Sequence, residues 1–361
     1  MEDLQLFKKL EINSQVHPYK VFFTKKINES LKDDLLVGDI IILDKNIYKL
    51  YPQIFDNINN KLILIEASEK AKSYNEIESI ISQIVEMGFR KNNKLVAIGG
   101  GITQDITSFI AFIIYRGVDW IFFPTNLLSQ CDSCIGSKLS INLKKFKNLV
   151  GGFYPPRKVF IDTQFLKSLS QKEIISGLGE MLHYFLVNSK KDMEFFKSKI
   201  KNAKKNISLI DQMIFRSLSI KKEMIELDEF DKGPRNVFNY GHTFGHAIES
   251  VTEYKIPHGI AVSYGIDIAN YISVKLGFLS VKERNYMRDL CIEIYLDFPL
   301  PNIKKNNYES ALKKDKKNIG NKIGLILSKG AGRVFKHLIE YKKIEKFLED
   351  YFREKIYLKN I

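Results

Sequence analysis

Short runs of β-branched and aliphatic residues recur in the first part of the chain, separated by segments whose apolar positions repeat at helical spacing. The runs predict strands at residues 39–43, 61–65, 94–98 and 120–123. Helical patterns at residues 74–87 and 103–115 fall between the later strands. Strands that alternate with helices are typical of a parallel sheet, so this part predicts a Rossmann-like α/β domain.

The pattern changes after Asp162, where long amphipathic segments replace the strand-like runs. Glycine and proline punctuate these segments, which predict helices at residues 173–187, 190–203, 207–227, 243–253, 259–276, 281–294 and 344–352. Residues 322–327, followed by Gly-Ala-Gly, predict a small strand and turn. We therefore expect an N-terminal Rossmann-like domain over residues 1–165 and a mainly helical domain over residues 166–361.

Composition agrees with two folded domains. The chain has 361 residues, of which 45% are hydrophobic, enough for two cores. Its net charge is +14, yet the lysines are scattered along helical stretches and no nucleic-acid-binding motif accompanies them. We expect no nucleic-acid partner, and a positive field also suits a phosphorylated small substrate.

The three cysteines, Cys131, Cys134 and Cys291, do not form a disulfide framework. Cys131 and Cys134 have CxxC spacing, but the chain has no second such pair and no redox-motif setting, so both are interpreted as packing residues. The first residues are charged and lack the apolar core of a signal peptide. Because no apolar run is long enough to span a bilayer, we expect a cytoplasmic protein with no membrane partner.

Three of the six histidines lie in one short stretch, NYGHTFGHAIES followed by YKIPHG. His242 and His246 are four residues apart and share a helix face, and His258 follows a turn. Imidazole binds zinc-like cations well at neutral pH. The upstream carboxylate of Glu180 would complete a site with one open position. The alternative is a buried helix whose histidines bind backbone groups, which the third histidine makes less favoured.

A second candidate site begins where the strand at residues 94–98 runs into Gly99-Gly100-Gly101 and then a helix. Glycines let backbone N–H groups approach a phosphate, and a helix N-terminus favours an anion. Asp105, one turn into the helix, is placed to bind a ribose or orient the turn. Asp44, at the end of the first strand, is placed for adenosine ribose hydroxyls. The turn is not GxGxxG, and an ordinary tight turn is the alternative.

Taken together, these motifs resemble the 3-dehydroquinate synthase family of sugar-phosphate cyclases. The resemblance rests on GGGITQDITSFIAFIIYRG, FFPTNLLSQCDSCIGSKLSINLKKFKNLVGGFYPP, DEFDKGPRNVFNYGHTFGHAIE and HGIAVSYG, in order, over residues 44–317. It implies a phosphate-eliminating lyase of the shikimate pathway of aromatic amino acid biosynthesis. In that family NAD oxidises a sugar alcohol, phosphate leaves, the same NADH reduces the ketone, and the ring recloses by an aldol step. A divalent metal, zinc or cobalt, polarises the alcohol.

The resemblance also implies roles for individual residues. The metal ligands would be Glu180, His242 and His258, while His246 would face substrate and assist proton movement. NAD contacts would come from Asp44, Glu69, Lys72, Gly99, Gly100, Gly101, Asp105, Thr125, Asn126, Asp132, Lys138 and Lys147. Contacts to a phosphorylated sugar acid would come from Asp132, Lys138, Asn148, Lys221, Arg235 and Asn239. Arg116 would reach the partner's phosphate site in a homodimer, and Lys316 and Lys317 would contact phosphate.

Three positions depart from the family pattern. His183 stands where the family has a substrate-binding lysine, Asn126 replaces threonine and Cys134 replaces serine. Lys221, Arg235 and Asn239 suit a carboxylate-bearing substrate and favour 3-deoxy-arabino-heptulosonate 7-phosphate. His183 favours another sugar-phosphate cyclase, of the valiolone- or inosose-forming type. A metal- and NAD-dependent polyol or glycerol-phosphate dehydrogenase of the same fold is disfavoured by Lys138 and Asn148, and a non-catalytic binding protein by the full set of metal ligands.

Overall fold

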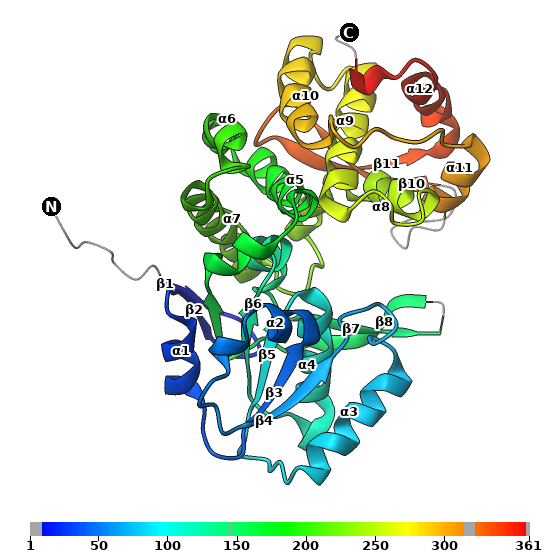
Figure 1. Ribbon diagram of the computed structural model, residues 1–361. Coiled ribbons are helices and arrows are strands. Elements are labelled where there is room, and N and C mark those ends of the chain that lie inside the picture. The colour runs from blue at the N-terminus through cyan, green and yellow to red at the C-terminus, as the bar shows by residue number, and fades with distance from the viewer. Residues whose placement is uncertain (1–8, 145, 314–321, 359–361) are drawn as a thin grey trace, which may run out of the picture. The chain divides into compact units, whose positions relative to one another are not determined.

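The computed structural model describes residues 9–144, 146–313 and 322–358 and divides into two compact units (Figure 1). The first extends to Leu169 and includes Lys221–Phe230, and the second comprises Ser170–Ile220 and the chain from Asp231 onward. The domain prediction placed residues 221–230 in the helical domain. They pack with the first unit because Lys221 pairs with Asp132 and because Glu229 accepts hydrogen bonds from Ser14 and Gln15.

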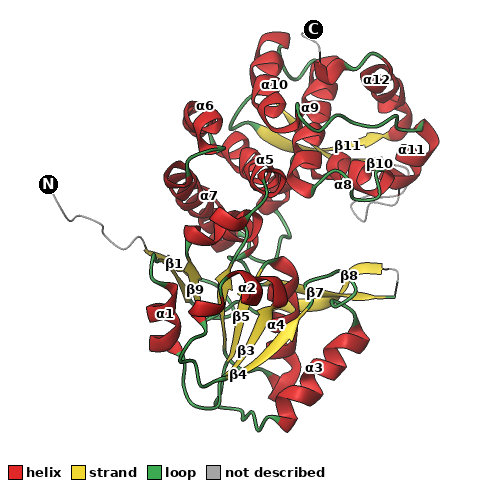
Figure 2. Cartoon of the chain, viewed as in Figure 1, coloured by secondary structure: helices red, strands yellow, loops and turns green. Residues whose placement is uncertain are grey.

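The first unit is built on a sheet of seven strands within the described residues, in the order β1-β2-β9-β6-β5-β3-β4. Every neighbouring pair is parallel except β1 with β2. Figure 2 shows this sheet in yellow with helices beside it. The strands are β1 (Lys9–Ile12), β2 (Tyr19–Phe23), β3 (Ile40–Asp44), β4 (Lys61–Ile65), β5 (Leu95–Gly99), β6 (Trp120–Pro124) and β9 (Lys158–Ile161).

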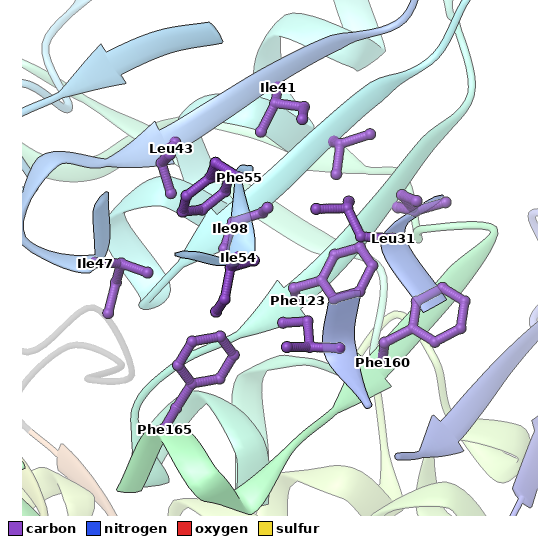
Figure 3. Close-up of a cluster of buried hydrophobic side chains, with 13 residues drawn as sticks. Leu31, Ile41, Leu43, Ile47, Ile54, Phe55, Ile98, Phe123, Phe160 and Phe165 are labelled. Carbon is purple, nitrogen blue, oxygen red and sulfur yellow. The ribbon is translucent and has the colours of Figure 1, made fainter. Parts of the chain in front are cut away.

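Residues of the central strands are buried on both faces, which explains their continuous apolar runs. One core cluster joins Leu43, Ile98, Phe123, Phe160 and Phe165 (Figure 3). The helices of this unit are α1 (Ile27–Asp34), α2 (Lys45–Leu50), α3 (Tyr74–Glu86) and α4 (Gly101–Ile113). The strands β7 (Lys138–Leu143) and β8 (Phe146–Phe153) form a separate antiparallel pair.

The second unit is mainly helical, as the sequence predicts. Its elements are α5 (Gln171–Asn188), α6 (Lys190–Ala203), the first part of α7 (Ile207–Leu227), α8 (His242–Val251), α9 (His258–Lys275), α10 (Val281–Tyr295), α11 (Lys305–Lys313), α12 (Tyr341–Arg353) and the hairpin of β10 (Lys322–Ser328) with β11 (Val334–Glu340). The helix α9 is buried on all sides from Gly259 to Ser273, so it forms the centre of this unit.

The predicted fold class, a parallel-sheet α/β domain plus a helical domain, is confirmed. The five predicted strands and nine predicted helices are present, with ends shifted by at most three residues. The two N-terminal strands, β9 and the β7–β8 hairpin were not predicted. None of the helices within the described residues has the length and apolarity needed to cross a membrane. Cys131, Cys134 and Cys291 are buried free thiols, in agreement with the packing interpretation.

Candidate functional site

The first candidate site lies at the carboxyl ends of β3 and β5. In the sheet, β3 lies between β4 and β5. The chain passes from β3 to its neighbour β4 and then to β5, the neighbour on the opposite side of β3. Neighbouring strands that send their connections in opposite directions create a switch point, where parallel sheets bind ligands. Leu43 pairs with Ile98, so Asp44 and Gly99 end adjacent strands. The sheet topology thus brings together the two motifs that the sequence singled out.

Gly99 and Gly100 of the glycine turn leave no room for a side chain. A Cβ atom on Gly99 would lie 2.3 Å from Oγ1 of Thr103, and one on Gly100 would lie 2.3 Å from Nδ2 of Asn126. Gly100 is the N-cap of α4 and Gly101 its first residue, so unhindered backbone N–H groups begin the helix. The amide of Thr125 donates to the carbonyl of Gly99 at 2.9 Å and ties β6 to the turn. This arrangement fits a diphosphate.

Asp44 has a structural role as well as its predicted one. Its carboxylate caps α2 by accepting from the amide of Asn46 at 2.8 Å. Burial raises the pKa of Asp44, and its backbone hydrogen bonds oppose that rise only partly. A half-buried carboxylate at the end of the strand next to the glycine turn is suited to accept hydrogen bonds from ribose hydroxyls.

Lys72 joins several predicted nucleotide and substrate positions. Its Nζ lies 2.5 Å from Oδ2 of Asp105 and donates to Oδ1 of Asn148 at 2.6 Å. Burial raises the pKa of Asp105 even though Lys72 opposes the shift. Asn148 has a left-handed backbone (φ 52°), held by a bond from its amide to Oδ1 of Asn142. Asn142 also donates to Glu69 at 2.7 Å. Sequence reasoning missed Asn142, which has no motif of its own.

A second cluster in this unit joins Asp132 and Lys221. The buried Nζ of Lys221 donates to both the backbone oxygen and Oδ1 of Asp132 at 2.7 Å. The neighbouring residue Ser133 donates to Oε1 of Gln104 on α4 at 2.6 Å. The two predicted substrate residues are therefore in contact, and the helix that follows the glycine turn fixes their segment.

Three further predicted positions of the first unit are exposed. Lys138 is exposed at the start of β7, and the exposed Lys147 lies 3.8 Å from Glu69. Arg116 is exposed in a turn in which Tyr115, Arg116 and Gly117 all have positive φ, at 49°, 64° and 111°. Non-glycine residues rarely adopt this conformation and often do so where function demands it.

The second candidate site is a buried carboxylate facing three imidazoles. Oε1 of Glu180 lies 3.5 Å from Nδ1 of His183 and 3.5 Å from Nε2 of His242, and Oε2 lies 3.3 Å from Nε2 of His258. A direct charge-assisted hydrogen bond would measure about 2.7–2.9 Å. Ligands about 2.0–2.2 Å from one tetrahedral ion lie about 3.3–3.5 Å apart. The spacing thus fits donors grouped around a zinc-sized cation.

Close backbone packing of three helices brings these donors together. A Cβ atom on Gly259, at the start of α9, would lie 1.8 Å from the carbonyl oxygen of Ser176 on α5. A Cβ atom on Gly265 would lie 1.9 Å from the carbonyl oxygen of Gly241, which precedes α8. Only glycine permits these approaches. The glycines beside the predicted ligands therefore set the distances between the helices that carry them.

The outer nitrogen of each predicted histidine ligand has its own acceptor. Nδ1 of His242 lies 3.2 Å from the backbone oxygen of Tyr240, and Nδ1 of His258 lies 3.1 Å from Oε2 of Glu249. These contacts leave Nε2 of both rings directed at Glu180, as a metal site requires. Glu249 was missed by sequence reasoning, although it lies in the same motif, three residues after His246.

The electrostatics suit a cation ligand. Burial alone would raise the pKa of Glu180, but His183, His242 and His258 outweigh burial and hold it well below its usual range. Burial alone would lower the pKa of His258, yet Glu180 and Glu249 raise it well above its usual value. The lowered pKa of Glu180 favours its anionic form, which is the form that binds a cation.

Of the other predicted residues of this unit, His246 has a donor atom within 4.8 Å of donor atoms of Glu249 and His258, so it also lies beside the proposed ligands. His246 is exposed, with its ring stacked on His258 at a centroid distance of 5.6 Å. Arg235 is buried and Nδ2 of Asn239 donates to the carbonyl of Asn236 at 3.1 Å, both within the turn Pro234–Asn239. Lys316 and Lys317 lie outside the described residues.

Two family models match the chain. The model for the 3-dehydroquinate synthase N-terminal region matches residues 62–176, and the model for the C-terminal region matches residues 177–318. A 3-dehydroquinate synthase of Pelagibacter ubique is 37% identical over 94% of this chain and 98% of its own length. One from Alkaliphilus metalliredigens is 34% identical over 95% of this chain and 99% of its own length.

Solved structures agree on the fold. A 2-deoxy-scyllo-inosose synthase in complex with carbaglucose-6-phosphate, NAD⁺ and Co²⁺ superposes with a TM-score of 0.87 at 24% identity, over 96% of this chain and all of the other. The 2-epi-5-epi-valiolone synthase of Streptomyces hygroscopicus, with NAD⁺ and Zn²⁺ bound, has a TM-score of 0.82 at 21% identity, over 93% and 97% of the two chains.

Proposed function

Because this chain belongs to the 3-dehydroquinate synthase family, we propose that it converts 3-deoxy-D-arabino-heptulosonate 7-phosphate to 3-dehydroquinate with loss of phosphate. The observation that carries the proposal is the cluster of Glu180, His242 and His258, at the motif positions of a family matched over nearly the whole chain. The reaction is that of a lyase in the shikimate pathway. The buried free thiols agree with a reducing cytoplasm as its location.

In this proposal the second unit holds a zinc or cobalt ion through Glu180, His242 and His258. When bound, NAD accepts and returns a hydride while the metal polarises the alcohol that is oxidised. The chain's own residues prepare that chemistry. Glu249 and the Tyr240 carbonyl fix the two histidine rings, and His246, exposed beside His258, is placed to move a proton.

In the first unit, the turn Gly99–Gly101 binds the diphosphate of NAD and Asp44 binds a ribose. The pairs Lys72 with Asp105 and Lys221 with Asp132 orient polar groups without leaving a buried charge uncompensated. The proposed contacts to phosphate, carboxylate and hydroxyls are Lys138, Asn148, Arg235 and Asn239. Asn126, Thr125 and the Glu69–Lys147 pair complete the proposed NAD contacts.

We propose that the chain acts as a homodimer in which Arg116 reaches the partner's phosphate site. The exposed guanidinium and the strained turn that presents it support this role. Arg116→Ala, measured for dimerisation by light scattering and for KM, separates the two outcomes. The proposal expects an intact dimer with a raised KM, and an unchanged KM would contradict it.

The function is tested by following phosphate and NADH together. The purified protein is incubated with NAD⁺, Co²⁺ or Zn²⁺ and the heptulosonate phosphate. The cyclase releases phosphate with no net NADH, because the hydride returns to the substrate. Accumulation of NADH without phosphate release would instead identify a dehydrogenase of the same fold.

One residue favours a second candidate, a cyclase for another sugar phosphate. His183 replaces the lysine that the family pattern places three residues after the metal-binding glutamate. A lysine ammonium is positively charged at neutral pH, whereas an imidazole changes its charge near neutral pH. Sedoheptulose 7-phosphate and glucose 6-phosphate, run in the same assay, test this candidate. Phosphate release from either one, with none from the heptulosonate phosphate, would replace the first proposal.

A further inference from the structure

The geometry points to His183 as a fourth protein donor to the metal ion, beside Glu180, His242 and His258. This inference rests on the proposed metal site and extends it by one residue specific to this chain. The family pattern places at this position a lysine, whose protonated ammonium cannot bind a cation. Imidazole replaces it with a nitrogen donor of the kind that zinc and cobalt prefer.

His183 lies on α5, one turn after Glu180. Residues three apart on a helix share a face, so His183 and Glu180 project together from one turn. The helix begins with a capping box formed by Ser170 and Glu173, which fixes its first turn. The helix is buried from Ile174 to Val187, so neither side chain has solvent to turn toward.

His183 is as close to the Glu180 carboxylate as His242 is. Its Nδ1 lies 3.5 Å from Oε1 of Glu180, the same separation as between that oxygen and Nε2 of His242. Donor atoms of Glu180, His183 and His242 all lie within 4.8 Å of one another. One oxygen thus has two imidazole nitrogens at the separation expected across one coordination shell of about 3.3–3.5 Å.

The ring of His183 is enclosed by other aromatic rings. The His183 ring is 1% exposed and stands edge-on to His242, with centroids 5.0 Å apart at 89°. Aromatic rings of Tyr184 and Phe238 cover it at centroid distances of 3.9 and 5.9 Å. An imidazole enclosed in this way has little space to follow a flexible substrate, whereas a fixed ring suits a metal ligand.

Four protein donors change the coordination of the ion. A three-ligand catalytic site reaches tetrahedral geometry with one water or substrate oxygen, but a fourth protein ligand makes that oxygen the fifth. We therefore expect a five-coordinate ion in the protein without substrate. We also expect tighter metal binding than three ligands would give.

The test measures metal binding without turnover. The metal-free full-length protein, His183→Gln and His183→Lys are titrated with Co²⁺ in competition with a chelator, and the visible d–d bands of the cobalt protein are recorded. In both variants the affinity for Co²⁺ is expected to fall at least about 10–100-fold. Their bands should gain intensity, because four-coordinate cobalt absorbs more strongly than five-coordinate cobalt.

His337→Gln is the matched control, since it removes an imidazole of the same unit that lies on β11, outside the donor cluster. Its cobalt affinity and spectrum are expected to match those of the unmodified protein. Thermal unfolding of the metal-free proteins separates a ligand from a packing residue. A packing residue lowers the unfolding temperature of metal-free His183→Gln and leaves cobalt affinity unchanged.

Unchanged cobalt affinity and spectrum in both His183 variants would overturn the inference, as would an equal loss of cobalt affinity in His337→Gln. These outcomes are distinct from failure of the proposed function. A protein that binds cobalt through His183 but releases no phosphate from the heptulosonate phosphate contradicts only the function. A protein that releases phosphate and binds cobalt equally well without His183 contradicts only the fourth ligand.

Discussion

The two candidate sites use charged residues in opposite ways. In the first unit the charges are already paired, since Lys72 contacts Asp105 and Lys221 contacts Asp132 within hydrogen-bonding distance. In the second unit Glu180 faces three imidazoles at 3.3–3.5 Å, longer than charge-assisted hydrogen bonds. The first arrangement compensates its own charges, and the second is spaced for a cation between its members.

Mutations in the two sites should therefore change different properties of the protein. In the first unit the glycine turn offers backbone groups to a ligand. The Lys72–Asp105 and Lys221–Asp132 pairs therefore act mainly by stabilising the fold. In the second unit the side chains are themselves the ligands, and glycines such as Gly259 allow the helices to approach. Substitutions should therefore lower stability and nucleotide affinity in the first unit, and metal affinity in the second.

The largest expected effect is that of Glu180→Gln. It removes the only negative charge among the four donors, so Zn²⁺ affinity should fall by about 100-fold or more and phosphate release should be abolished. NAD⁺ affinity should stay largely unchanged, because the glycine turn and Asp44 belong to the other unit. Calorimetric titration with each ligand measures both. Comparable turnover in the variant would refute the ligand assignment.

Lys72→Met should act through stability instead. It leaves the carboxylate of Asp105, 24% exposed, without its cation, which should cost about 2–3 kcal/mol of unfolding free energy and weaken NAD⁺ binding. Metal affinity should not change. Lys147→Met is the matched control, because Lys147 is 41% exposed and lies 3.8 Å from Glu69. Its effect on urea unfolding should stay within about 0.5 kcal/mol, and equal losses in both variants would contradict the prediction.

Glu249→Gln should give a smaller loss on the metal side. It weakens the contact that orients Nδ1 of His258, so Zn²⁺ affinity should fall about tenfold while urea unfolding of the metal-free protein changes little. Glu253→Gln, 82% exposed just beyond α8, is the control and should leave affinity unchanged. Equal affinities in the two variants would show that Glu249 does not position His258.

Local patterns in the sequence were sufficient for the central strands, for most of the long helices and for the family motifs. The continuous apolar runs of β3 and β5 and the glycines after β5 predicted a parallel sheet with a phosphate turn. The antiparallel β1–β2 pair was missed because β1 and β2 have only four and five residues, so the alternating burial of β2 gives a weak signal in the sequence.

The contacts between distant residues were beyond such patterns. Spacing alone grouped His242 with His246, whereas the structure directs His242 and His183 at the same oxygen of Glu180. Asn142 and Glu249 were missed because their roles depend on which side chains the fold places beside them. Residues 221–230 follow the same rule, since their pairing with the first unit depends on contacts across the chain.

The smallest expected effect comes from an ion pair outside both sites, which should affect stability but not ligand binding. Asp192 on α6 accepts from Nε and Nη2 of Arg216 at 2.7 and 3.0 Å. Burial alone would raise the pKa of Asp192, but hydrogen bonds from Arg216, Ser189 and Asn188 outweigh it and lower the pKa. Asp192→Asn should cost about 1 kcal/mol at neutral pH and leave both ligand affinities unchanged.

The pH dependence of that cost follows from the sign of the shift. A carboxylate whose pKa is lowered by folding stabilises the protein fully above its unfolded value, about 3.9, and loses that contribution as pH falls through the lower folded value. The difference between the unmodified protein and Asp192→Asn in urea unfolding should therefore shrink below about pH 4. Asp289→Asn, 65% exposed beside Arg288, is the control and should show no such difference. A gap for Asp192→Asn that widens in acid would contradict the assigned direction, since it would require the folded carboxyl to prefer its proton.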